Sequence, residues 1–191
     1  VDAFHDWLLY EAFSQAKKLA DGNVGADLCL NIPANYCYSK SIFRSVEDSI
    51  AYHQIDPTRV ELEITESTLM LHPERSVALL NRLHDKGLRL AVDDFGTGYS
   101  NLGYVQKIKV AKLKIDRSFV KGIDTHCDNQ AIVRAVHNIA DGLIMNTVAE
   151  GVEHKCELAF LKKLGITHGQ GYLWSRSVSI SSLTALVHKA A

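Results

Sequence analysis

The stretch LRLAVDDFGTGYSNLGYV, residues Leu88–Val105, decides how the rest of the chain is interpreted. An apolar run ends in two adjacent aspartates, Asp93 and Asp94, and a glycine-bearing loop follows. Carboxylates this close together repel each other, and burying them without a partner is costly. The pattern predicts a buried strand that delivers two carboxylates to a site where a cation offsets their repulsion.

The composition is that of a globular domain with a hydrophobic core. The 191 residues are 47% hydrophobic, and 21 basic residues nearly balance 22 acidic ones. These values predict one domain, residues 1–191, and indicate neither a nucleic-acid polymer nor a membrane surface as partner. The four cysteines form no C-x-x-C pair, so we interpret them as reduced structural thiols. The chain begins at Val1 rather than Met, which predicts a domain excised from a longer parent protein.

Short runs rich in Val, Ile and Leu predict six strands, and segments of helical periodicity alternate with them. The predicted strands are 27–31, 60–64, 88–93, 111–115, 146–149 and 169–173. The predicted helices are 7–20, 42–53, 74–86, 130–143, 153–164 and 181–189. This alternation is typical of parallel strands joined by helical crossovers. It leaves two architectures open, a doubly wound open sheet and a closed (β/α)₈ barrel.

Each predicted strand carries an acid, an amide or a lysine at or near its carboxyl end. These residues are Asn31, Glu63, Asp93, Asp94, Lys114, Asp116, Glu150 and Gln170. Barrels build their sites from the carboxyl ends of several strands, whereas an open sheet concentrates its site at one switch point, usually with a glycine fingerprint. No G-x-G-x-x-G or Walker sequence is present. The pattern therefore favours the barrel.

The acidic and amide members of this set favour a hard divalent cation. Their ligand atoms are all oxygen, which suits Mg²⁺ or Mn²⁺ better than structural zinc. Two adjacent aspartates can bridge a pair of cations about 4 Å apart, and a neighbouring lysine stabilises charge on phosphate oxygens. Each residue alone has an ordinary explanation as a helix cap, a turn residue or a solvated carboxylate. The set as a whole favours a metal-assisted phosphoryl site.

Six motifs, in order along the chain, resemble the EAL domain, the bacterial family of cyclic di-GMP phosphodiesterases. They are NIPAN (31–35), ELEITE (61–66), DDFGTGYSNL (93–102), LKIDRSFV (113–120), VAEGVE (148–153) and QGYLWS (170–175). The resemblance implies a (β/α)₈ barrel with one antiparallel strand. It implies hydrolysis of cyclic di-GMP to linear pGpG at a two-metal site holding Mg²⁺ or Mn²⁺. It also implies a cytoplasmic domain whose parent protein can be membrane-anchored and is fused to sensor or GGDEF-type domains.

The resemblance assigns roles to individual residues through these motifs. The implied metal ligands are Asn31, Glu63, Asp93, Asp94 and Glu150, with Asp93 bridging. Lys114 is implied to contact the attacking water, and Glu150 to be catalytic as a second-metal ligand or as a general base. The residues implied to line the substrate site are Gln170 and Asp116. Glu66 is implied to hold the loop 95–100, which the family links to dimerisation, so we expect a homodimer through this loop.

The sequence departs from the family pattern at its amino end. The Glu-Ala-Leu tripeptide that names the family, whose glutamate is a metal ligand, does not occur ahead of Asn31. Six predicted strands and 191 residues, against eight strands and about 250 residues, predict a barrel that lacks about two amino-terminal strands. Two alternative functions stay open. One is a catalytically inactive cyclic di-GMP receptor, and the other is an unrelated metal-dependent barrel acting on small phosphorylated or carbonyl substrates.

Overall fold

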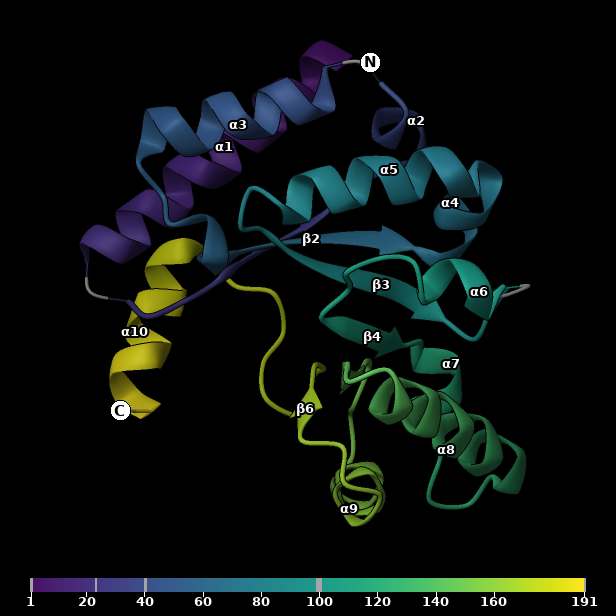
Figure 1. The fold of residues 1–191 in the computed structure, drawn as a ribbon. Helices are drawn as coiled ribbons and strands as arrows, with labels where there is room; N and C mark the ends of the chain where they lie inside the picture. Colours follow the sequence, from purple (N-terminus) through teal and green to yellow (C-terminus); the bar gives the residue numbers. More distant parts are fainter. Residues whose placement is uncertain (1, 23, 40, 99–100, 191) are drawn as a thin grey trace.

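The computed structural model describes residues 2–22, 24–39, 41–98 and 101–190. Its centre is a sheet of six strands in the order β1-β2-β3-β4-β5-β6, and each strand is parallel to its neighbours. The strands are β1 (Leu28–Asn31), β2 (Val60–Thr65), β3 (Arg89–Phe95), β4 (Lys112–Ile115), β5 (Asn146–Ala149) and β6 (His168–Gly169). The sheet curls into a partial barrel with helices around its outer side (Figure 1).

Long helices connect the strands, and short helices follow several strand ends directly. The long helices are α1 (Asp2–Asp21), α3 (Ile42–His53), α5 (Pro73–His84), α8 (Cys127–Gly142), α9 (Lys155–Lys163) and α10 (Ile180–Ala190). The short ones are α2 (Ala34–Cys37), η1 (Pro57–Arg59), α4 (Glu66–Leu71), α6 (Leu102–Val105) and α7 (Arg117–Val120). Within the described parts of the chain, no helix is both long enough and apolar enough to cross a membrane.

The two faces of the sheet differ in chemistry. Leu62, Leu90 and Leu113 are fully buried in the core that the sheet forms with the outer helices. Successive strand residues point to opposite faces, so Glu63 on β2 and Lys112 on β4 lie on the other face, on either side of β3. The sheet therefore has an apolar outer face under the helices and a charged inner face, and the charged face supplies the site.

The last predicted strand, 169–173, is wrong in its extent. The strand β6 ends at Gly169, and a turn follows it. Gly171 passes so close to the loop after β5 that a Cβ atom there would lie 2.1 Å from the carbonyl oxygen of Val152. The Val152 amide donates to the Gln170 oxygen, and the Val152 oxygen accepts from the Leu173 amide. The chain thus crosses this loop instead of continuing along the strand.

The strand count confirms the predicted partial barrel. All six described strands are parallel, so the antiparallel strand that the resemblance implies is not among them. Within this sheet β1 and β6 each have a single neighbour. The other predicted strands and the long helices are present, with ends shifted by a few residues; α1, for example, begins at Asp2 rather than at residue 7.

Candidate functional site

Asp93 and Asp94 lie near the end of β3, in a local irregularity that turns both carboxylates to one side. In a regular strand, consecutive side chains point to opposite faces. The pairing of β3 with β4 shifts register between Val92 and Phe95, and Asp94 has a φ of 53°, in the left-handed region. Oxygen atoms of Asp93, Asp94 and Glu150 consequently lie within 4.8 Å of one another. Aspartate is one of the few residues that enter this region readily.

Lys114 is the cation beside these carboxylates. It lies on β4 and only 5% of its surface is exposed. Its Nζ atom is 2.7 Å from Glu63 Oε2, 3.1 Å from Asp93 Oδ2 and 2.7 Å from Glu150 Oε1. One ammonium group thus contacts carboxylates delivered by β2, by β3 and by the residue after β5. A buried charge needs partners of this kind, because an unpaired one would be strongly destabilising.

Burial and ion pairing oppose each other at this cluster. Burial works to lower the pKa of Lys114, but hydrogen bonds with Glu150 and Glu63 outweigh it and hold the pKa above its usual range. Burial raises the pKa of Glu63 and of Glu150, and Lys114 only partly reverses the effect. Burial also raises the pKa of Asp94, and repulsion from Asp93 adds to it. The lysine is therefore charged, and Glu63, Glu150 and Asp94 hold protons more readily than isolated carboxyl groups do.

Glu66 holds the start of the loop that follows Asp94. Its Oε2 atom accepts hydrogen bonds from the amide of Gly96 at 2.8 Å and from the amide of Gly98 at 3.4 Å. Gly96 has a φ of +100°, which favours glycine. The loop was expected to run over 95–100, and its residues 99 and 100 lie outside the described part of the chain. Within the described part, a buried carboxylate fixes the backbone next to the aspartates.

A cavity of about 590 Å³ opens beside the cluster. Asp94, Asp116, Glu150 and Gln170, all singled out from the sequence, line it. Asp116 caps α7 and accepts a 2.9 Å hydrogen bond from the Ser118 amide. Burial works to raise the pKa of Asp116, but the hydrogen bonds from Ser118 outweigh it and lower the pKa. Asp116 is therefore a carboxylate that stays ionised beside the carboxylates that protonate more easily.

Sequence reasoning missed several residues that also line this cavity. They are Arg117, Ser118, Lys121, Gly151, Glu153, Gly171 and Tyr172. Each lies a few residues beyond the end of β4, β5 or β6, within or beside the motifs LKIDRSFV, VAEGVE and QGYLWS. Their position just after a strand end could have identified them, because that is where a barrel builds its site.

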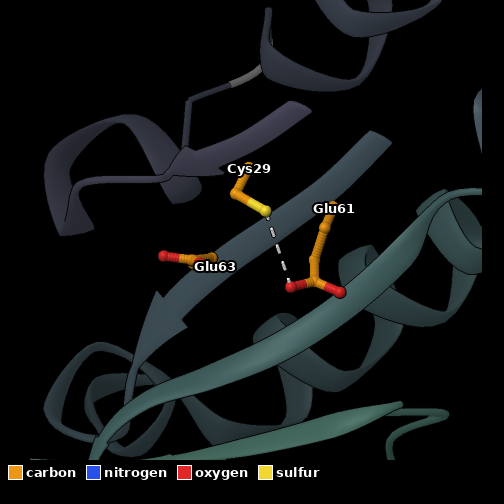
Figure 2. Close-up of side chains that lie close together, drawn as sticks. All are labelled: Cys29, Glu61 and Glu63. Carbon is orange, nitrogen blue, oxygen red and sulfur yellow. Dashed lines mark hydrogen bonds between the residues drawn. The ribbon is translucent and has the colours of Figure 1, made fainter. Parts of the chain in front are cut away.

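A second group of possible ligand atoms lies at β1 and β2. Figure 2 shows Cys29 between Glu61 and Glu63. The Cys29 sulfur is 3.8 Å from Glu61 Oε1, and Lys112 Nζ lies 2.8 Å from Glu61 Oε2. Burial, and then Glu61, raise the pKa of the Cys29 thiol to about 11. Cys29 is thus a free thiol whose neutral form is favoured by its surroundings.

The implied ligand Asn31 lies on β1, next to Glu63, which contacts Lys114. It ends β1 beside Glu63 in the register of the sheet, and its side chain is exposed. The structure gathers Glu63, Asp93 and Glu150 around Lys114. The acidic donor set of Asp93, Asp94 and Glu150 offers only carboxylate oxygens, which fits a hard divalent cation.

Comparisons with known proteins agree with this geometry. The EAL domain model matches residues 1–177. MucR of Pseudomonas aeruginosa, a bifunctional diguanylate cyclase/cyclic di-GMP phosphodiesterase, is 34% identical over 183 residues, covering 95% of this chain and 27% of MucR. The cyclic di-GMP phosphodiesterase NbdA of the same organism is 34% identical over 187 residues, covering 96% of this chain and 24% of NbdA. The chain spans about a quarter of the length of these relatives.

Solved structures share the fold at the same level of identity. The PaMucR phosphodiesterase in complex with c-di-GMP superposes with a TM-score of 0.90 and 34% identity, covering 95% of this chain and 74% of that one. The manganese/cy-diGMP complex of Klebsiella pneumoniae BlrP1 gives a TM-score of 0.79 and 32% identity, covering 87% of this chain and 42% of that one. With the family model matched over nearly its whole length and the motif residues gathered at one end of a curled parallel sheet, the chain belongs to the EAL domain family.

Proposed function

We propose that this chain is the phosphodiesterase domain of a larger protein and hydrolyses cyclic di-GMP to linear pGpG with the help of divalent cations. The observation that carries the proposal is the group of carboxylates Asp93, Asp94 and Glu150, two of which, Asp94 and Glu150, line a cavity of about 590 Å³. Cavities of a few hundred cubic ångströms suit small-molecule ligands. Related proteins named as cyclic di-GMP phosphodiesterases support the choice of substrate.

The proposed cation ligands are Asp93, Asp94 and Glu150, with Glu63 and Asn31 beside them. Support comes from their oxygen-only donor set and from the manganese-containing complex of BlrP1. We propose Mg²⁺ or Mn²⁺ as the ion. Bound there, such ions polarise a phosphate group and make water a better nucleophile at neutral pH.

The side chains of the cluster have distinct tasks in this proposal. Lys114 keeps three carboxylates in place through contacts of 2.7–3.1 Å and presents positive charge to the phosphate. Glu150 has a raised pKa, and its Oε2 atom takes the proton of the attacking water while Oε1 stays on Lys114. Gln170 and Asp116 line the cavity and orient the dinucleotide.

The bond changes balance without a further reactant. The water oxygen bonds to phosphorus, and the bond from phosphorus to the ribose O3′ breaks. The proton taken from water is returned to that O3′, which leaves as a hydroxyl group. The product is the linear dinucleotide with one 5′-phosphate.

Three further proposals follow from the family. The loop after Asp94, held by Glu66, contributes to a homodimer. The domain acts in the cytoplasm. The parent protein carries additional signalling domains, because the matched relatives are about four times as long and MucR is also named a diguanylate cyclase.

The test is a turnover assay with cyclic di-GMP and either Mg²⁺ or Mn²⁺, in which chromatography follows the products. Wild type and Asp48→Asn, which changes an exposed carboxylate on α3, are expected to release pGpG. Asp93→Asn is expected to lose at least about three orders of magnitude in rate, since an acid of the cluster becomes neutral. Circular dichroism checks that each variant is folded.

Two results would contradict the proposal. Equal rates for wild type and Asp93→Asn would place the reaction elsewhere. Tight binding of cyclic di-GMP by a folded wild type that never forms pGpG would favour the receptor function instead.

A further inference from the structure

Glu157 is a buried carboxylate behind the wall of the proposed catalytic cavity. It lies in the first turn of α9, and only 1% of its surface is exposed. It is not one of the described residues that line the cavity, which include Glu150 and Glu153 from the loop just before α9. Any effect of Glu157 on the reaction must therefore pass through the segments that it binds.

The two oxygens of Glu157 bind two different segments of the chain. Its Oε2 atom accepts hydrogen bonds of 2.9 Å from the amides of Glu153 and His154, which directly precede α9. Its Oε1 atom accepts a 2.9 Å hydrogen bond from the amide of Gly122, 35 residues earlier in the chain. A glutamate that caps the start of a helix needs only one oxygen for this task. The second oxygen therefore makes a link that the helix itself does not require.

Both of the segments that Glu157 joins form part of the cavity wall. Lys121, which immediately precedes the bound glycine amide, lines the cavity after α7, and Glu150 lines it after β5. The two segments are also packed directly against each other, because a Cβ atom on Gly151 would lie 2.5 Å from the Cβ atom of Arg117. With contact in front and the carboxylate behind, neither segment can shift without the other.

We propose that Glu157 is a positioning residue for the reaction at this site. By fixing the backbone after β5, it keeps Glu150 at the place where its Oε1 atom lies 2.7 Å from Lys114 Nζ. This inference rests on the proposed function, in which Glu150 takes the proton of the attacking water. The rate of such a step is sensitive to displacements of an ångström or less, whereas substrate affinity is spread over the whole cavity. Glu157 therefore acts on kcat more than on KM.

The test is Glu157→Gln, assayed for kcat and KM with cyclic di-GMP and Mg²⁺ at a temperature where circular dichroism shows every variant to be folded. Glutamine keeps one accepting oxygen for the start of α9, but its NH₂ group cannot accept from the second segment. We expect kcat to fall at least about tenfold and KM to change less than about threefold.

The matched control is Asp56→Asn, which also turns a capping carboxylate into an amide. Asp56 accepts a 2.9 Å hydrogen bond from the Thr58 amide at the start of η1, ahead of β2 and therefore at the end of the sheet opposite the site. This variant is expected to lose stability while its kcat stays within about twofold of wild type.

Hydrogen exchange at the Gly122 amide reports the link itself. Exchange there is expected to accelerate at least about fivefold in Glu157→Gln and to stay unchanged in Asp56→Asn. Faster exchange with an unchanged kcat would overturn the positioning role and leave the proposed function intact. An equal fall of kcat in both variants would also overturn it, since general destabilisation would then explain the loss. A folded wild type without turnover would overturn both proposals.

Discussion

Lys114 Nζ lies 2.7 Å from Glu150 Oε1, which ties β4 to the first residue after β5. The same nitrogen reaches Glu63 and Asp93, so one buried positive charge faces three carboxylates. The sequence predicted a cation beside the adjacent aspartates, and the side chain of Lys114 provides one at 3.1 Å from Asp93 Oδ2. Divalent cations bound there would neutralise the negative charge that Lys114 leaves uncompensated.

Replacing Lys114 by methionine is expected to make the fold depend on added cations. Without Lys114 the carboxylates lose their buried partner, so the free energy of unfolding in EDTA should fall by about 3–5 kcal/mol. Because Mg²⁺ can replace the missing charge, part of this loss should return when Mg²⁺ is added. Urea denaturation with and without Mg²⁺ measures both effects.

The control for this variant is Lys112→Met. Lys112 lies on β4 like Lys114, and its ammonium group is 2.8 Å from Glu61 Oε2. The substitution should lower stability as well, but Mg²⁺ should restore less of it, because Glu61 lies outside the group of Asp93, Asp94 and Glu150. If Mg²⁺ rescued both variants equally, the distinction between the two acidic groups would be wrong.

Glu66→Gln is expected to loosen the loop after Asp94. Glu66 is 1% exposed, and one of its oxygens accepts from the amides of Gly96 and Gly98. An amide is a weaker acceptor than a carboxylate, so stability should fall by about 1–3 kcal/mol. Hydrogen exchange at the Gly96 amide should accelerate. Glu74→Gln, on the exposed start of α5, should change neither quantity.

Glu157→Gln is expected to lose stability in a pH-dependent way. Glu157 is 1% exposed and accepts hydrogen bonds of 2.9 Å from the amides of Gly122, Glu153 and His154. Burial works to raise its pKa, but these backbone hydrogen bonds outweigh it and lower the pKa below 4.5. The ionised form therefore stabilises the fold above about pH 4.5, and this contribution disappears as the pH falls through the folded-state pKa.

The measurement is the free energy of unfolding of wild type and Glu157→Gln between pH 3 and pH 7. The difference should be about 1–3 kcal/mol near pH 7 and should shrink as the solution becomes more acidic than about pH 4. A difference that stays constant over the whole range would mean that the negative charge of Glu157 is not what stabilises these amides.

Ile144→Gly is expected to stabilise the domain. Ile144 is 95% exposed and has a φ of 60°, a left-handed conformation that a β-branched residue adopts only under strain. Glycine removes the strain at some entropic cost. The free energy of unfolding should therefore rise by about 1 kcal/mol, and Tm by about 2–4 °C. Turnover should not change, because Ile144 precedes β5 and the site lies beyond its other end. Gln54→Gly, at a φ of 52° without a β-branch, should gain less.

The strand ends could be predicted because their sequence pattern is local. Val60–Ile64 and Asn146–Ala149 are short runs with an acid beside their last residue, Glu63 and Glu150, and the strand alone places these acids. The extent of β6 could not be predicted, because Gly171 leaves the strand to pack against Val152, a contact between segments about 20 residues apart. The short helices α4 and α7 escaped prediction since each has too few residues to show a period.

The candidate site was predictable as a set of residues and not as a geometry. The sequence placed Asp93, Asp94 and Glu150 at strand ends, but the register shift that turns both aspartates to one side depends on how β3 pairs with β4.

The register shift in β3 has a consequence for how this sequence can change over evolutionary time. Because alternate residues face opposite sides up to Val92, inserting or deleting one residue within Arg89–Val92 would send Asp93 toward the helix-covered core. A substitution in the same segment changes only one side chain. The length of this strand is therefore more tightly constrained than its composition, and functional descendants should differ in the residues before Asp93 while keeping their number.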